Sequence, residues 1–239
     1  MIPAYNEELR LPSTLETLLA YLKNEANGAY GPWELIVVND GSKDATAAIA
    51  KRLAVNEPNI CILENPGNKG KGYSVKHGML EARYDWVLFS DADLSAPITE
   101  VPKLFEAASR QQAEIAIGSR ALDRSLIGTH QSGLRELGGR VFNVVAQLGT
   151  GLRLWDTQCG FKLFRRDAAQ AVFKRLCLER FGFDVEALFV ARSLGYRIVE
   201  VPVRWSHVDG TKVSLATDSV DMFGDIARVR WNAWKGLYR

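Results

Sequence analysis

The sequence has few cysteines and no long apolar run. Its cysteines, Cys61, Cys159 and Cys177, are far apart, and none belongs to a Cys-x-x-Cys pair or a Cys/His cluster at zinc spacing. A disulfide framework is therefore not expected, and a reducing, cytoplasmic location is. No stretch approaches the roughly 20 apolar residues of a membrane-spanning helix, and no signal peptide precedes the first motif. If a membrane matters, we expect the protein to lie on its inner face as a peripheral protein.

A strong excess of one charge is also absent. The chain has 30 Lys and Arg against 28 Asp and Glu, a net charge of +2. We therefore expect no nucleic-acid partner. The histidines, His77, His130 and His207, are scattered and are not assigned to a metal. A length of 239 residues with 47% hydrophobic content fits a single α/β domain over residues 1–239.

Apolar runs alternate with amphipathic stretches along the first half of the chain. This β-α-β-α-β order predicts an α/β fold with a mostly parallel central sheet flanked by helices, whose ligands sit at the carboxyl ends of the strands. Strands are expected at 33–38, 59–63, 87–89, 113–118, 163–164 and 198–205, and helices at 13–22, 44–53, 73–82, 102–112, 135–148 and 181–194. Pro3 resembles the end of a strand with almost no strand before it, so we expect a truncated amino-terminal strand.

Two carboxylates follow the apolar run Val87–Phe89. Asp91 and Asp93 are separated by one small residue, Ala92. Side chains two residues apart in an extended segment project to the same side, so both can reach one hard cation. Mg²⁺ or Mn²⁺ held by carboxylates and phosphate oxygens is typical of diphosphate chemistry. An Asp-rich turn without a ligand is the alternative.

Other polar residues have two readings each. The 67–72 loop, G-N-K-G-K-G, offers phosphate-binding amides and lysines but matches neither the dinucleotide nor the P-loop pattern, so a flexible turn is the alternative. Asp40 is a nucleoside ligand or a helix cap. Arg120 and Arg135 suit phosphate binding or are solvated surface charges.

The tail from 219 to 239 has a helical pattern with an apolar face and basic flanks. Such a helix lies at a membrane interface or packs against the core of the domain. The apolar face consists of Met222, Phe223, Ile226, Val229, Ala233, Trp234 and Leu237, and the basic residues are Arg228, Arg230, Lys235 and Arg239.

The order of the motifs resembles the inverting family 2 glycosyltransferases of the GT-A (Rossmann-like) fold. The motifs are P-A-Y-N-E at 3–7, V-N-D-G-S at 38–42, N-K-G-K-G at 68–72, D-A-D at 91–93, G-S-R at 118–120, D-T-Q-C-G-F-K at 156–162 and D-G-T-K-V at 209–213. The most similar branch is the dolichyl- or polyprenyl-phosphate sugar synthases. The resemblance covers nearly the whole chain.

The resemblance implies roles for single residues. Asp91 and Asp93 would carry Mg²⁺ or Mn²⁺, and Arg120 and Arg135 would meet the acceptor phosphate. The nucleotide-sugar donor would be bound by Pro3, Ala4, Tyr5, Glu7, Asp40, Lys71, Asp91 and Ala92. A Gln that mannosyl relatives often carry is replaced by Ser95.

The implied reaction is transfer of a hexose, with glucose from UDP-glucose favoured, onto a dolichyl or polyprenyl monophosphate. A phosphate monoester has a second pKa of about 6, so at pH 7 it is mostly dianionic and already nucleophilic. Its attack on the sugar therefore needs hardly any base. GDP-mannose-dependent dolichyl-phosphate mannose synthase remains an alternative. So does a transferase acting on a hydroxyl group, for which Asp156 is the candidate base. A nucleotide-sugar-binding module without turnover is the alternative from a different class.

Overall fold

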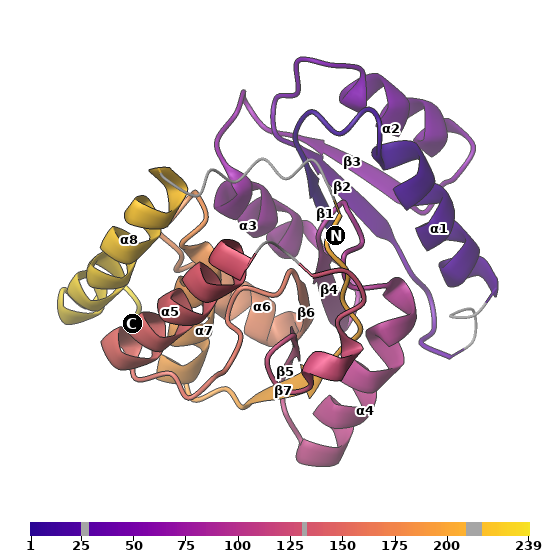
Figure 1. Cartoon of the computed structure of the whole chain (residues 1–239). Coiled ribbons are helices and arrows are strands. Elements are labelled where there is room, and N and C mark those ends of the chain that lie inside the picture. The colour runs from indigo at the N-terminus through magenta and orange to yellow at the C-terminus, as the bar shows by residue number, and fades with distance from the viewer. Residues whose placement is uncertain (25–28, 131–132, 209–216) are drawn as a thin grey trace.

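The computed structural model describes residues 1–24, 29–130, 133–208 and 217–239 (Figure 1). The D-G-T-K-V motif at 209–213 lies outside the described residues. Helices cover both faces of a twisted sheet, with the first half of the chain on one side of the molecule and the second half on the other (Figure 1).

The strands form two hydrogen-bonded groups that meet at their edges. One group is parallel in the order β1-β2-β3, and the other has the order β4-β6-β5-β7. Met1 N donates to Leu88 O (2.6 Å) and Ser90 N donates to Met1 O (3.1 Å), which is the bonding pattern of a parallel pair. The strands are β1 (Ile2–Ala4), β2 (Leu35–Asn39), β3 (Ile60–Glu64), β4 (Trp86–Ser90), β5 (Ile115–Ser119), β6 (Phe161–Arg165) and β7 (Ile198–Pro202).

The sheet is mostly parallel, as expected, and has one reversed strand. Strand β1 is short and pairs with β2, so the expected truncation of the amino-terminal strand stays a prediction. The reversed strand is β6, which runs antiparallel to both β4 and β5. The sequence of a strand does not show its direction, so the reversal of β6 could not be predicted from its apolar residues.

The helices agree with the sequence pattern in place but not always in extent. Ser13, expected to cap the first helix, lies inside it, and its Oγ donates to Arg10 O. Helix α6 follows β6 with no Gly or Pro between them, and this short helix was not predicted. The helices are α1 (Leu11–Asn24), α2 (Thr46–Val55), α3 (Lys71–Glu81), α4 (Val101–Gln111), α5 (Gly133–Thr150), α6 (Arg166–Phe173), α7 (Phe183–Ser193) and α8 (Thr217–Trp234), with short 3₁₀ turns at Ile98–Glu100 and Arg124–Leu126.

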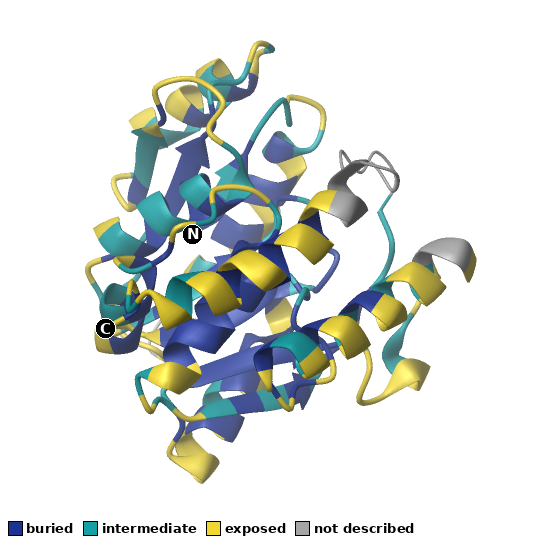
Figure 2. Cartoon of the chain, turned by 90° about the vertical axis from the view of Figure 1, so that its left-hand side faces the viewer, coloured by how far each residue is buried: buried dark blue, intermediate teal, exposed yellow. Residues whose placement is uncertain are grey.

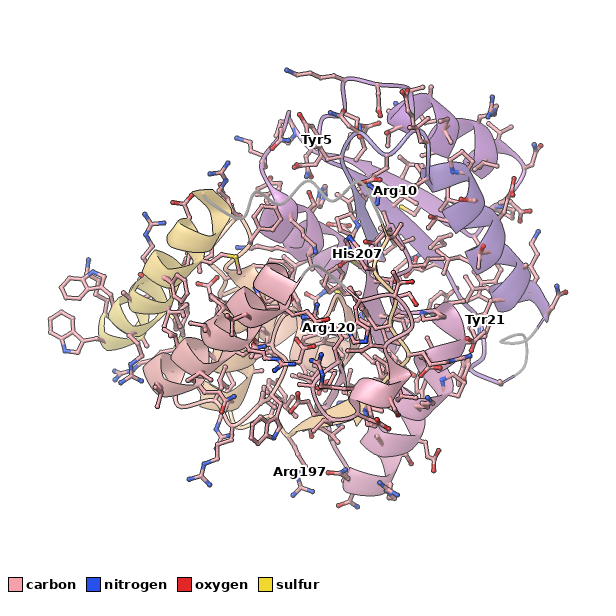
Figure 3. All side chains as sticks on the ribbon, in the orientation of Figure 1. Tyr5, Arg10, Tyr21, Arg120, Arg197 and His207 are labelled. Carbon is pink, nitrogen blue, oxygen red and sulfur yellow. The ribbon has the colours of Figure 1, made fainter. Side chains whose placement is uncertain are left out.

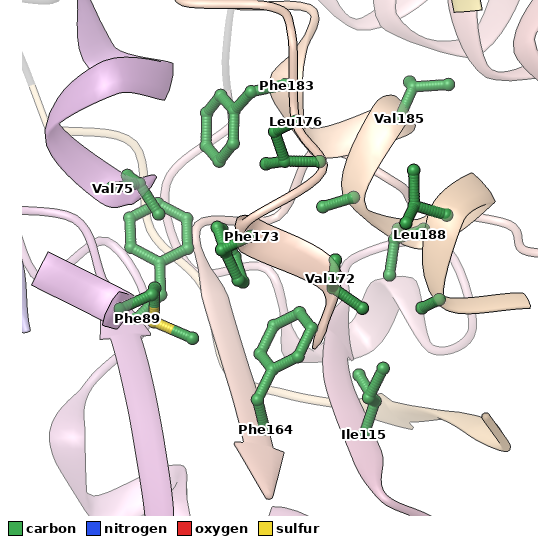
Figure 4. Packing of buried hydrophobic residues seen from close by; sticks show 14 of the residues in the cluster. Val75, Phe89, Ile115, Phe164, Val172, Phe173, Leu176, Phe183, Val185 and Leu188 are labelled. Carbon is green, nitrogen blue, oxygen red and sulfur yellow. The ribbon is translucent and has the colours of Figure 1, made fainter. Parts of the chain in front are cut away.

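Both faces of the sheet are buried, as the continuous apolar run of β2 predicts. Ile36 and Val38 belong to a cluster under α3, α6 and α7, whereas Leu35 and Val37 belong to a cluster under α1, α2 and α4. The first cluster has an aromatic centre shown in Figure 4, where Phe89 of β4 contacts Phe183 edge-on, with ring centroids 5.8 Å apart. This packing fixes the end of β4, from which the two carboxylates emerge.

Helices α5 and α8 pack together on one side of the molecule and turn many exposed residues outward (Figure 2). The residues expected to form one apolar face of the tail are divided between the core and the exposed surface. Met222, Ile226 and Val229 are buried in the core, whereas Phe223, Trp234 and Leu237 are exposed. Trp231, which was not assigned to that face, is exposed as well. The helix therefore packs against the domain and also presents an apolar surface.

Candidate active site

The candidate site residues gather at one edge of the sheet. Strands β4 and β5 point the same way because both run antiparallel to β6, so the residues after them, Asp91 and Arg120, emerge at the same edge. The turn that precedes β6 enters the sheet at that edge and brings Asp156 with it. A pocket here is lined by Ser90, Asp91, Ser95, Ala96, Cys159, Gly160 and Trp205.

The D-A-D turn is held on each side by hydrogen bonds. Asp91 N donates to Gly160 O (3.0 Å), and Thr14 Oγ1 of α1 donates to the carbonyl of the buried Ala92 (2.7 Å). Asp93 Oδ1 accepts from Ser95 N (2.9 Å). The turn is therefore fixed while parts of both carboxylates remain accessible, as a cation site requires.

Gly160 is required by its contact with Asp91. A Cβ at position 160 would lie 2.0 Å from Asp91 Oδ2, a distance that no side chain tolerates. The glycine of the D-T-Q-C-G-F-K motif thus makes room for the first carboxylate of the D-A-D motif. The sequence contained this glycine, but its partner 69 positions away (91 to 160) could not be read from it.

Lys71, the first residue of α3, reaches the D-A-D turn. Its Nζ lies 2.7 Å from Asp91 Oδ1, and both side chains are partly exposed. Burial alone would lower the pKa of Lys71, but the carboxylates of Asp91 and Asp184 outweigh burial, and the net pKa is raised. Lys71 is therefore a cation next to the candidate metal ligand, and its contact with the donor stays a prediction.

Beneath this pair lies a second one that sequence reasoning missed. Lys162 of β6 is buried, and its Nζ donates to Asp184 Oδ1 (2.5 Å) and to Cys159 O (2.6 Å). Both ammonium groups lie over the ring of Phe89, with Lys71 Nζ 5.5 Å and Lys162 Nζ 5.7 Å from its centroid. Burial raises the pKa of Asp184, and the two lysines act against that rise. The only signal for this pair was Lys162 at the end of a motif.

Arg120 forms a bidentate ion pair with Asp156. The Nε–Oδ2 distance is 2.6 Å and the Nη2–Oδ1 distance is 2.8 Å, and Arg120 N also donates to Oδ2 (3.0 Å). The guanidinium stacks on Trp205, 5.4 Å from the ring centroid. Burial would lower the pKa of Arg120, but Asp156 raises it overall. Arg120 is labelled near the middle of the view in Figure 3.

Asp156 is poorly suited to act as the base that one alternative reaction needs. Burial raises its pKa, but Arg120 lowers it more, so the net pKa lies below the usual value. Its oxygens also accept from Gln158 N (3.2 Å) in addition to the three bonds from Arg120. The geometry assigns Asp156 to holding Arg120 in place.

Asp40 lies at the end of β2 and binds the loop that carries Lys71. Oδ1 accepts from Lys69 N (2.9 Å) and from Asn65 Nδ2 (2.8 Å), and Oδ2 accepts from Gly70 N (2.8 Å). Asp40 therefore does not cap α2; Asp44 accepts from Thr46 N at that end. Asn65, another residue that we did not predict, also binds Ser74 and His77.

The amino-terminal motif lies beside the turn after β2. Pro3 and Ala4 are in β1, and the chain turns at Asn6, which has a φ of 54°. Asn6 N donates to Ser42 Oγ (3.0 Å), and Glu7 N donates to Thr46 Oγ1 (2.7 Å). Tyr5 lies in this turn, in the amino-terminal half of the molecule (Figure 3).

Arg135 is in the first turn of α5, but its side chain lies outside the described part of the structure. The expected pairing of Arg120 and Arg135 around a phosphate therefore stays a prediction. Within the described residues, no group of three or more His, Cys, Asp or Glu could by itself hold a metal ion. A cation at Asp91 and Asp93 would need ligands from the substrate and from water.

Sequence comparison identifies relatives along the whole chain. Residues 1–173 match the glycosyl transferase family 2. The dolichyl-phosphate β-glucosyltransferase of Dictyostelium discoideum is 35% identical, with 100% of this chain and 75% of that protein covered. The enzyme of the same name from Drosophila melanogaster is 42% identical, covering 90% of this chain and 68% of that protein. The human enzyme of that name is 33% identical, with 100% of this chain and 76% of that protein covered.

Solved structures show the same fold at lower sequence identity. Glucosyl-3-phosphoglycerate synthase from Mycobacterium tuberculosis, in complex with Mn²⁺, UDP-glucose and phosphoglyceric acid, aligns with a TM-score of 0.69 and 17% identity over 95% of this chain and 77% of that one. The complex of the same enzyme with UDP aligns with a TM-score of 0.67 and 18% identity, over 95% of this chain and 78% of that one. With the family match and the curated relatives, the conclusion follows that this chain belongs to glycosyl transferase family 2 and has its GT-A fold.

Proposed function

We propose that this protein transfers glucose from UDP-glucose to a dolichyl or polyprenyl monophosphate, with inversion at the anomeric carbon. The relatives of 33–42% identity are named dolichyl-phosphate β-glucosyltransferases. The observation that carries the proposal is the arrangement at the sheet edge, where Asp91 faces Lys71 and Arg120 is locked by Asp156. The transfer of a sugar from a diphosphate to a monophosphate needs carboxylates that hold a metal cation and positively charged side chains that bind the phosphates.

Asp91 and Asp93 fit Mg²⁺ or Mn²⁺. Their oxygens are the ligand type that both cations prefer, and no described residue donates a hydrogen bond to Asp91 Oδ2 or Asp93 Oδ2. When bound, such a cation neutralises charge on the leaving diphosphate. Ser95 contributes its backbone N–H to Asp93, so it orients that carboxylate.

The donor would lie between the amino-terminal motif and the D-A-D turn. We propose that Pro3, Ala4, Tyr5 and Glu7 contact the nucleoside, and that Ala92 contacts the donor through its backbone. Lys71 would bind a diphosphate oxygen, for which its ammonium is already placed at 2.7 Å from Asp91. Asp40 would act through the loop 67–72, because its carboxylate oxygens are bonded to that loop and to Asn65.

The acceptor phosphate would be bound by Arg120 together with Arg135. A dianionic phosphate attacks the anomeric carbon without a base, and the buried, ion-paired Asp156 offers none. This is the observation that favours a phosphate acceptor over a hydroxyl acceptor. Arg120 keeps part of its surface accessible while Asp156 and Trp205 fix its orientation.

We further propose that residues 1–239 work as one domain that docks on the inner face of a membrane through α5 and α8. No helix within the described residues has the length and apolarity needed to cross a bilayer. Trp234 and Leu148 are 76% and 82% exposed. Other exposed apolar residues on the two helices are Leu137, Val141, Val144, Val145, Phe223, Trp231 and Leu237. Arg228, Arg230 and Lys235 add positive charge for anionic headgroups.

The test of the proposed function is a donor screen with polyprenyl phosphate and Mn²⁺ or Mg²⁺, reading nucleotide release and lipid product together. UDP-glucose should give both products in wild type. Asp91→Asn and Asp93→Asn should each lose turnover by orders of magnitude, and chelator should abolish it. Asp85→Asn, an exposed carboxylate just before β4, is the matched control and should keep full turnover. Turnover with GDP-mannose instead, or binding without turnover, would contradict the proposal.

Membrane docking has its own test. Removal of α8 is unsuitable, because Met222, Ile226 and Val229 are part of the core and their loss would unfold the domain. Trp231→Ser with Trp234→Ser leaves the core intact and should abolish cosedimentation with anionic vesicles. Val55→Ser, at an 82% exposed position on α2, is the control and should bind as wild type does. Equal binding of all three proteins would exclude this surface as the contact.

A further inference from the structure

The loop that carries Lys71 is packed against the backbone of a second segment, residues 177–182. Tyr73 N donates to Glu179 O (3.0 Å). A Cβ on Gly70 would lie 2.6 Å from Glu179 O, and a Cβ on Gly72 would lie 2.8 Å from Leu178 O. The glycines on both sides of Lys71 are therefore in close contact with segment 177–182. A shift of this segment would shift Lys71.

Segment 177–182 is in turn held by a buried carboxylate of α7. The residue Glu186 is fully buried. Its Oε2 accepts from Leu178 N (2.8 Å), and Cys177 N lies 3.0 Å from Oε1 and 3.1 Å from Oε2. A buried backbone N–H that loses its acceptor is costly, so these bonds define where the segment begins.

The carboxylate of Glu186 is fixed from the other side by the residues that follow α8. Tyr238 is buried, and its hydroxyl donates to Glu186 Oε1 (2.6 Å). Its ring packs edge-on against Phe189, with centroids 6.1 Å apart, and Asn232 Nδ2 lies 3.3 Å from its hydroxyl. A continuous set of contacts therefore runs from Tyr238 through Glu186 and segment 177–182 to Lys71.

We propose that Glu186 and Tyr238 are positioning residues for the donor site: they hold segment 177–182, and through it the loop 67–72, in the arrangement in which Lys71 binds a nucleoside diphosphate. The inference rests on the proposed function, because it takes Lys71 to be part of the donor site. Tyr238 thus acts on the donor site through Glu186 and segment 177–182.

The test is binding of UDP in the presence of Mn²⁺ to the full chain, measured by calorimetry. Tyr238→Phe removes one hydroxyl and keeps the ring that packs on Phe189. We expect UDP affinity to fall by roughly three- to tenfold, which is less than the full effect of losing one hydrogen bond to a charged group, because only part of that loss is transmitted to the loop 67–72. Glu186→Gln should act in the same direction, because its amide nitrogen cannot accept a hydrogen bond. Tyr30→Phe, which removes a hydroxyl from an exposed ring stacked on Phe105, is the control and should bind UDP as wild type does.

A readout by hydrogen exchange separates positioning from general stability. In Tyr238→Phe the amides of 177–182 and of 68–73 should exchange faster, while those of β2 stay protected. A lower melting temperature with unchanged UDP affinity and unchanged exchange in 68–73 would show a structural role alone and would overturn the inference. If wild type itself binds no UDP, the proposed function fails instead.

Discussion

The Arg120–Asp156 pair provides a quantitative test of how burial changes the contribution of an ion pair to the free energy of unfolding. Asp156→Asn keeps the shape of the side chain and removes its charge. Arg120 would then face a neutral amide whose nitrogen cannot accept from its N–H groups. Removing one partner of a buried pair costs about 3–5 kcal/mol of unfolding free energy. At about 2–4 °C per kcal/mol for a domain of this size, the melting temperature should fall by roughly 6–20 °C.

The chain contains a control with the same geometry at the surface. Arg165 and Asp167 also form a bidentate pair, with distances of 2.6 Å and 2.7 Å, but their side chains are 46% and 58% exposed. An exposed pair contributes about 1 kcal/mol or less, so Asp167→Asn should lower the melting temperature by only about 4 °C or less. Equal losses in the two variants would refute the argument that burial, and not geometry, sets the cost.

The pH dependence of the same variant checks the sign of the effect. The folded-state pKa of Asp156 lies below its ordinary value of 3.8. Its contribution is therefore fully present above that ordinary value and is lost as the pH falls through the lower folded-state pKa. The difference in unfolding free energy between wild type and Asp156→Asn, measured with urea, should shrink as the pH drops below about 4. A difference that stays constant down to acid unfolding would show that charge is not its source.

Two further predictions concern residues beneath the D-A-D turn. Gly160→Ala should weaken Mn²⁺ binding and turnover, because its Cβ would lie 2.0 Å from Asp91 Oδ2. Gly138→Ala is the control and should weaken neither, because its new Cβ would meet no atom within 4 Å. Titration of both variants with Mn²⁺ measures the difference. Lys162→Met should destabilise the fold by about 3–5 kcal/mol, because it leaves Asp184 buried without its partner. Lys162→Met with Asp184→Leu should recover most of that loss, and a double variant no more stable than Lys162→Met in urea unfolding would contradict the pairing.

The strand ends could be predicted from the sequence because local patterns determine them. The apolar run of β2 and the polar residues after it placed Asp40 at the edge of the sheet, and the same reasoning placed Asp91. A local pattern cannot show which distant residue completes a site. Gly160 is needed by Asp91, and Asp156 by Arg120, across turns whose path depends on β6 running against its neighbours. The family resemblance supplied the motifs that contain these residues but not their contacts.

The tail helix shows a second reason why a hydrophobic pattern alone does not determine the environment of a helix. A helical apolar face is expected both for a helix that packs on a core and for one that lies on a membrane. In α8 the residues Met222, Ile226 and Val229 are buried, while Trp231 and Trp234 are exposed and contact each other with tilted rings, whose centroids are 5.0 Å apart. The contacts of the neighbouring helix α5 decide which stripe is covered, and these contacts are not encoded in the tail.

The same helix links the two parts of the proposed function. Its outer surface is the proposed membrane contact, and the residue Tyr238 beyond its end reaches Glu186 and, through segment 177–182, the loop of Lys71. If a lipid surface and the donor both favour this arrangement of α8 over another one, each strengthens the binding of the other by the same factor, because coupling between two sites is reciprocal. Anionic vesicles without any lipid phosphate acceptor should therefore tighten UDP binding in wild type, and this gain should disappear in Tyr238→Phe while vesicle binding persists. Vesicles that bind wild type and leave its UDP affinity unchanged would show that the helix anchors the enzyme without influencing its donor site.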